Sequence, residues 1–130
     1  MAPRGRGRTR PNGRRRTSLR GEDFLAAHVD RFNAGVRSGD FGPMLDEFAD
    51  NAELAFEGVP VGPFRGKEAI ARAYAEQPPD DEIDILRTRE SSDDLIVVDY
   101  AWRADPKARA GAMIFRLRDG KIDRLLVTFG

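Results

Sequence analysis

The sequence predicts an α+β fold in which helices cover one face of an antiparallel sheet. Apolar residues recur at helical spacing in three segments before residue 80, and from residue 82 onward they alternate as in strands. An Asp-Gly pair at residues 119–120 separates two of the later strands and is typical of a two-residue hairpin turn. Helices followed by an antiparallel meander favour the α+β class, and 130 residues suit one domain with one core.

Charge is distributed unevenly along the chain. Residues 1–20 contain eight arginines and no acid, which leaves 14 basic and 22 acidic residues in the remainder. Residues 1–21 have too few apolar side chains to offset the entropy of ordering, so we predict a disordered basic tail there and a folded domain over residues 22–130. The tail is either a weak nucleic-acid arm, a solvated extension or a segment upstream of the true start.

Composition excludes several kinds of site and location. The chain has no cysteine and one histidine, and neither a phosphate-binding loop nor an acidic metal cluster is evident. We therefore expect no metal and no nucleotide cofactor. No apolar run reaches the roughly 18 residues of a membrane span, and the start lacks a secretory signal, so we expect a cytoplasmic protein without membrane contact.

Two helices are predicted first. Residues 22–37 carry an apolar stripe at spacings of three and four, and Gly39 suits the left-handed cap that follows it. The stripe consists of Phe24, Leu25, Ala27, His28, Val29, Phe32 and Val36. A short second helix is expected over residues 43–48, with Pro43 near its first position.

A strand, an irregular connection and a third helix come next. Residues 50–51 read as a turn, residues 53–57 as a strand, and residues 58–63 as a stiff connection rich in glycine and proline. The third helix begins near Gly66 and is stopped by the prolines at 78 and 79.

Four strands complete the prediction, at residues 82–89, 95–103, 110–117 and 122–129. In the second of these, Val98, Tyr100 and Trp102 share one face, and Asp99 lies on the opposite, solvent-facing side. In the third, Met113 and Phe115 share a face.

Three short motifs resemble the SnoaL-like branch of the nuclear transport factor 2-like superfamily, which is related to ketosteroid isomerases. They are RSGD at residues 37–40, FADNA at residues 48–52 and FRGKEAI at residues 64–70, followed by the strand–hairpin ending. The resemblance covers residues 22–130. It implies a curved sheet wrapped on the first helix as a cone, a cystatin-like roll, with an apolar pocket inside. It also implies a homodimer through the outer face of the sheet.

The same resemblance assigns positions in the pocket. Ketosteroid isomerases carry a carboxylate base nine residues before the glycine of the third-helix motif, which corresponds to Glu57. A supporting tyrosine of that family is matched by Tyr74. The two residues that form the oxyanion hole in the isomerases correspond to Phe32 and Met113. Both are apolar, so the hydrogen-bond donors that the family uses there are absent.

Glu57 is the first candidate for chemistry. A carboxyl group in an apolar cone is desolvated, which raises its pKa and suits it to proton transfer. The alternative is a solvent-facing glutamate at the end of its strand, because Phe56 is the more natural core residue and alternate residues face opposite ways.

Three further polar residues are candidates. His28 lies on the apolar stripe, where it is either a core histidine or a partner for Glu57 or a ligand. Tyr74 and Tyr100 either donate to a ligand oxygen or bond to the backbone within the core. The apolar candidates are core by default and line a pocket only if the cone is open. They are Phe32, Phe56, Val98, Trp102, Met113, Phe115, Val127 and Phe129.

These features predict a small-molecule-binding protein. We expect a small apolar organic ligand and acid/base chemistry without a cofactor, by an isomerase, cyclase or hydrolase that acts on a carbonyl or cyclic compound with Glu57 as base. The alternative is a non-catalytic ligand-binding or dimerisation module of the same fold.

Overall fold

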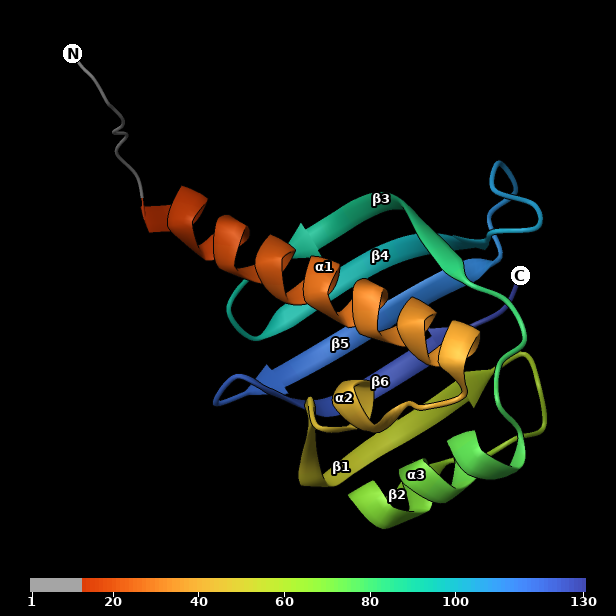
Figure 1. Cartoon of the computed structure of the whole chain (residues 1–130). Helices are drawn as coiled ribbons and strands as arrows, with labels where there is room; N and C mark the ends of the chain where they lie inside the picture. Colours follow the sequence, from red (N-terminus) through yellow and green to blue (C-terminus); the bar gives the residue numbers. More distant parts are fainter. Residues whose placement is uncertain (1–12) are drawn as a thin grey trace.

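In the computed structural model, which describes residues 13–130, a curved six-stranded sheet is covered on one face by three helices (Figure 1). The helices are α1 (Gly13–Ser38), α2 (Gly42–Leu45) and α3 (Lys67–Glu76). The strands are β1 (Phe48–Glu57), β2 (Phe64–Arg65), β3 (Ile83–Ser91), β4 (Leu95–Trp102), β5 (Gly111–Arg118) and β6 (Lys121–Thr128). The α+β prediction is confirmed, with the long α1 lying across the sheet (Figure 1).

Helix α1 begins earlier than predicted, at Gly13 rather than at residue 22. Residues 14–20 contain neither glycine nor proline, and arginine is a good helix former, so the backbone can continue the helix. The prediction for the tail falls partly on residues 1–12, which lie outside the described residues, and the domain boundary at residue 22 stays a prediction.

The strands are ordered β2-β1-β6-β5-β4-β3. The last four strands form the predicted antiparallel meander, and the turn before β6 has positive φ at Asp119 (53°) and Gly120 (79°), as a two-residue hairpin requires. Strands β1 and β6 pair in parallel, which the prediction of an antiparallel sheet did not include. Strand β2, which pairs with β1, was also not predicted.

Strand β1 is twice as long as predicted. It starts at Phe48 instead of residue 53, and α2 ends at Leu45. The predicted turn at residues 50–51 is wrong, because the register against β6 shifts between Phe48 and Glu53 and the strand continues through this irregularity.

Two kinds of contact fix α1 on the sheet. The buried Asn33 side chain donates from Nδ2 to the Ile83 carbonyl at 3.0 Å and accepts from the Ile83 amide at 2.9 Å, so it pairs with the edge strand as a backbone would. Phe24 packs edge-on against Phe115 of β5, with ring centroids 6.0 Å apart. The orientation of α1 is therefore fixed at both ends of its buried stripe.

Candidate functional site

A cavity of about 240 Å³ lies between the helices and the concave face of the sheet. Helices α1 and α3, all six strands and the connections around α3 contribute to its wall. The lining is His28, Phe32, Leu54, Phe56, Val61, Phe64, Ala73, Tyr74, Gln77, Pro79, Ile83, Tyr100, Trp102, Met113, Leu125, Val127 and Phe129. The wall is therefore mainly apolar and aromatic, with a few polar atoms.

Most of the candidates from the sequence meet in this cavity. Phe32, Phe56, Trp102, Met113, Val127 and Phe129 line it together with His28, Tyr74 and Tyr100. These residues come from both ends of the chain, and the roll brings them together because β1 pairs with β6.

Two predicted lining residues belong to the closed core instead. Val98 and Phe115 are 0% exposed and do not contact the cavity. Phe115 is covered by α1, with the His28 ring centred 5.0 Å away and the Phe24 ring 6.0 Å away. Both predicted residues are on the correct face of the sheet, but α1 packs over that part of it.

Glu57 does not reach the cavity. It is the last residue of β1, it is exposed, and it is absent from the cavity wall, whereas its neighbour Phe56 lines the cavity and stacks on Phe129. Alternation along β1 places Phe56 inside and Glu57 on the outer face. The expectation that the Glu57 carboxyl points inward is corrected by this geometry.

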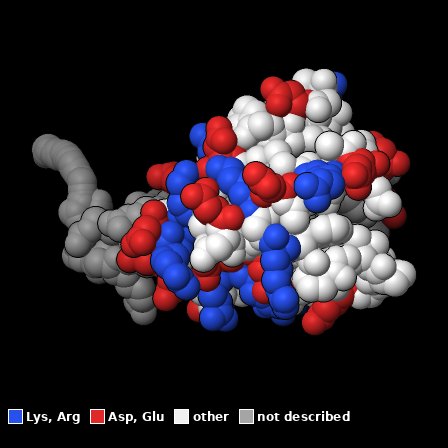
Figure 2. Space-filling model, turned by 90° about the horizontal axis from the view of Figure 1, so that it is seen from below, with Lys and Arg blue, Asp and Glu red and all other residues white. Residues whose placement is uncertain are grey.

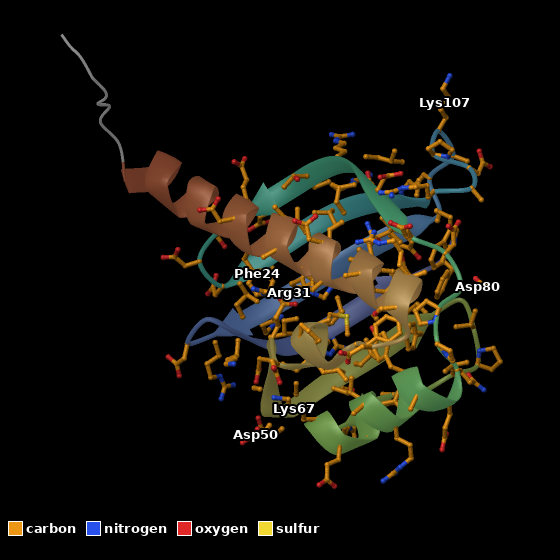
Figure 3. All side chains as sticks on the ribbon, viewed as in Figure 1. Phe24, Arg31, Asp50, Lys67, Asp80 and Lys107 are labelled. Atoms are coloured by element: carbon orange, nitrogen blue, oxygen red, sulfur yellow. The ribbon has the colours of Figure 1, made fainter. Side chains whose placement is uncertain are left out.

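A different carboxylate is connected to the cavity. The side chain of Glu47, just before β1, is 7% exposed. Its Oε1 lies 2.8 Å from Nδ1 of His28, and its Oε2 accepts a hydrogen bond of 2.6 Å from Arg31. Arg31 and the partly buried Phe24 both lie along α1 (Figure 3).

The contact with Glu47 determines which nitrogen of the neutral His28 ring carries the proton. An ionised carboxylate only accepts hydrogen bonds, so Nδ1 of His28 must carry the proton that it donates to Glu47. The His28 side chain is 2% exposed and forms part of the cavity wall. Within residues 21–130, whose side chains the structure describes, no hydrogen-bond partner is found for its other nitrogen, Nε2.

Two phenols supply further polar atoms. Burial raises the pKa of Tyr74, and no partner for its hydroxyl is found in the described part of the chain. Burial also raises the pKa of Tyr100 to about 12, although the nearby Arg109 acts in the opposite direction. The Tyr100 hydroxyl donates to the Thr128 carbonyl over a long 3.3 Å. Both phenols therefore remain protonated donors at neutral pH.

Sequence reasoning did not find Glu47 or the part of the wall formed by the connections around α3. Glu47 was assigned to a helix, so its burial next to His28 was not visible. The missed apolar residues include Val61 and Pro79, which lie on irregular connections, and Phe64, which lies on the two-residue strand β2. Glu47 stands next to a second acid, Asp46, between Leu45 and Phe48, so no local signal distinguishes it.

The outer face of the sheet holds a second buried carboxylate. Asp99 was predicted to be solvated, but it is 5% exposed and accepts hydrogen bonds from Arg89 at 3.0 Å and Arg109 at 3.1 Å. Burial alone would raise the pKa of Asp99, but these bonds outweigh it and hold the pKa below its usual value.

On the face of the molecule that Figure 2 shows, acidic and basic side chains are interspersed, so neither sign of charge dominates there. Among the side chains that the structure describes, no group of three or more from His, Asp or Glu is arranged to hold a metal ion. None of the described helices is long and apolar enough to cross a membrane.

The comparison with known families agrees with this architecture. Residues 29–125 match the SnoaL-like domain. The chain belongs to the SnoaL-like family. No curated protein matches the sequence significantly.

Solved structures of the same fold include other SnoaL-like and isomerase-like proteins. A SnoaL-like protein of unknown function from Burkholderia thailandensis is 22% identical, with a TM-score of 0.70 over 88% of this chain and 97% of the other. A proposed ketosteroid isomerase from Kribbella flavida is 13% identical, with a TM-score of 0.62 over 87% and 79% of the two chains. A computationally designed 17-OHP binder is 19% identical, with a TM-score of 0.64 over 82% and 91%. At these identities the likeness establishes the fold of this SnoaL-like chain.

Proposed function

We propose that this SnoaL-like protein binds a small apolar organic compound that carries a carbonyl or hydroxyl oxygen. The observation that supports this is a mainly apolar cavity lined by Tyr74 and His28, whose hydroxyl group and Nε2 have no described protein partner. A ligand oxygen would satisfy the Tyr74 donor, which is otherwise costly to bury.

The size of the cavity limits the ligand. Its volume of about 240 Å³ is below the range of about 300–1,000 Å³ that is usual for drug-sized ligands. We therefore expect one ring or two fused rings rather than a larger molecule.

The sequence provides a built-in probe for this binding. Trp102 is the chain's one tryptophan, and it lines the cavity, so its fluorescence reports occupancy. We expect 1-tetralone to change this fluorescence with about tenfold higher affinity than tetralin, which has the same rings without the oxygen, because one hydrogen bond of about 1.4 kcal/mol separates them.

The matched variant is Tyr74→Phe, which removes only the hydroxyl. We expect the preference for 1-tetralone over tetralin to shrink in this variant, while the affinity for tetralin is kept. Equal affinity of the parent protein for both compounds, or no fluorescence change with either, would contradict the proposed function.

The proposed ligand is compatible with either an acid/base enzyme that needs no cofactor or a non-catalytic binding module. With Glu57 on the outer face, the isomerase, cyclase or hydrolase alternative depends on another base.

We also propose a homodimer through the outer face of the sheet. Four apolar side chains remain partly exposed there: Leu95, Val97, Ile114 and Leu126. Sedimentation equilibrium of the parent and of Ile114→Lys tests this, with the parent expected as a dimer and the variant as a monomer. A monomeric parent would contradict it.

A further inference from the structure

We propose that His28, oriented by Glu47 and Arg31, is the proton acceptor for the ligand in the cavity. This inference rests on the proposed function, because it concerns the chemistry of the same ligand. It names a base on α1 in place of Glu57 on β1, and a positioning carboxylate that sequence reasoning did not find.

The first support is the contact between His28 and Glu47. The distance of 2.8 Å from Nδ1 to Oε1 joins two side chains that are 2% and 7% exposed. Arg31 donates to the other carboxylate oxygen, Oε2, at 2.6 Å, which leaves Oε1 to face His28. Nδ1–H is therefore held on Glu47, and the lone pair of neutral His28 is on Nε2.

The second support is the packing of the ring. Phe115 meets the His28 ring edge-on at 5.0 Å, and Phe24 stacks at 6.3 Å, one turn earlier on α1. These contacts and the bond to Glu47 restrict rotation of the imidazole. A base held in one orientation does not need to be ordered when the ligand arrives.

The third support is the unpartnered nitrogen. Among the described side chains, those of residues 21–130, no donor or acceptor meets Nε2, although the side chain is almost completely buried. A histidine with a purely structural role would be expected to satisfy both nitrogens, because an unpaired buried polar atom is costly. Since His28 lines the cavity, a ligand is the partner that fits.

The chemistry follows from these atoms. With a cyclic ketone in the cavity, Nε2 accepts a proton from the carbon next to the carbonyl. The electron pair of the broken C–H bond forms a C=C bond, and the carbonyl π electrons move to oxygen, where the Tyr74 hydroxyl donates a hydrogen bond to the enolate. Return of the proton from Nε2 to the same carbon, or to a conjugated one, completes exchange or isomerisation without another reactant.

Nuclear magnetic resonance of the ring nitrogens tests the orientation without any ligand. His28 is the chain's one histidine, so its signals need no assignment by mutation. In the neutral form of the ring we expect a proton on Nδ1 and none on Nε2. In Glu47→Gln the amide can donate to Nδ1, and the proton is expected on Nε2, because an amide partner selects the other tautomer.

Deuterium incorporation from D₂O into 1-tetralone, at the carbon next to the carbonyl, tests the chemistry. We expect the parent protein to accelerate exchange, and both His28→Gln and Glu47→Gln to lose at least about 100-fold of that acceleration. Glu90→Gln, the same change at an exposed position of β3, is the matched control and should exchange as the parent does.

The outcomes separate the two proposals. If Trp102 fluorescence shows no binding of 1-tetralone, the proposed function fails and this inference with it. If 1-tetralone binds but the parent does not accelerate exchange, or His28→Gln exchanges at the parent rate, the inference is overturned and the binding function stands. Loss of exchange in Glu57→Gln with full activity in His28→Gln would also overturn it, as would a neutral ring in the parent that carries its proton on Nε2.

Discussion

Glu47 and Asp99 are two buried carboxylates on opposite sides of one sheet, and each side chain is 7% exposed. Asp99 is held by Arg89 and Arg109, whose side chains are 48% and 40% exposed and end in solvent. Glu47 shares its charge between Arg31, which is 47% exposed, and His28, which is 2% exposed and lines the cavity. A buried carboxylate thus marks a candidate chemical site only when its partner carries a reactive atom into a cavity.

The largest expected difference between the two clusters is in stability. Glu47→Ala should lower the free energy of unfolding by about 3 kcal/mol, because His28 stays buried without its partner. Asp99→Ala should cost less, since both arginines can return to water. Urea denaturation of the two variants and the parent measures the free energies of unfolding. An equal or larger loss of stability in Asp99→Ala than in Glu47→Ala would contradict the proposed difference between the two carboxylates.

The cavity side and the outer side of the sheet also differ in the free volume next to their small side chains. Ala73 lines the cavity, so Ala73→Leu should fill part of it and weaken 1-tetralone binding about tenfold without a loss of stability. Ala101, two residues from Asp99, is 0% exposed, and Ala101→Leu should cost about 1–3 kcal/mol by overpacking. Trp102 fluorescence and urea denaturation are the measurements. A stability loss in Ala73→Leu as large as in Ala101→Leu would mean that the cavity is not open.

Alkaline pH should affect the cavity side. The pKa of Tyr100 is raised to about 12, so between pH 10 and 12 the unfolded chain releases this proton before the folded one does, and stability falls as pH rises. Tyr100→Phe should remove on the order of 1 kcal/mol of that fall, after allowance for solvent screening. Denaturation at pH 9 and at the alkaline limit measures it, and an unchanged slope in the variant would contradict the assignment.

Acid should affect the outer side, by a smaller amount. Hydrogen bonds from Arg109 and Arg89 outweigh burial and hold the pKa of Asp99 below its usual value, so its contribution is present above about pH 4. As pH falls through the lowered pKa, that contribution is lost. In Asp99→Asn, the free energy of unfolding should therefore fall less steeply as pH is lowered, and 1-tetralone binding should be unchanged. A steeper loss of stability at acid pH in the variant than in the parent would contradict this prediction.

Local patterns were sufficient for most of the fold. The apolar stripe of α1, the alternation in β4 and β5 and the Asp-Gly turn each depend on neighbours in sequence, and each is found as predicted. The errors fall where a long-range partner decides. Residues 48–52 look like a helix end and a turn, but pairing with β6 makes them the start of β1.

The candidate site was predicted less completely than the fold. His28, Tyr74, Tyr100 and the aromatic wall could be named from periodicity and from the resemblance to the family. The direction of Glu57 could not, because a register change of one residue moves a side chain to the other face of a strand. The contact of Glu47 with His28 joins positions 19 apart in sequence, and no local pattern records it.

The sequence by itself determined the class of fold, the family and the set of side chains available for chemistry, since these follow from periodicity, turn residues and composition. The tertiary structure alone decided which acid serves the cavity and which faces water. The physical reason is that burial, and the hydrogen bonds that burial requires, are set by contacts between distant segments. The packing of α1 over β5 places His28 between Glu47 and the cavity, while the pleat of β1 directs Glu57 away from it.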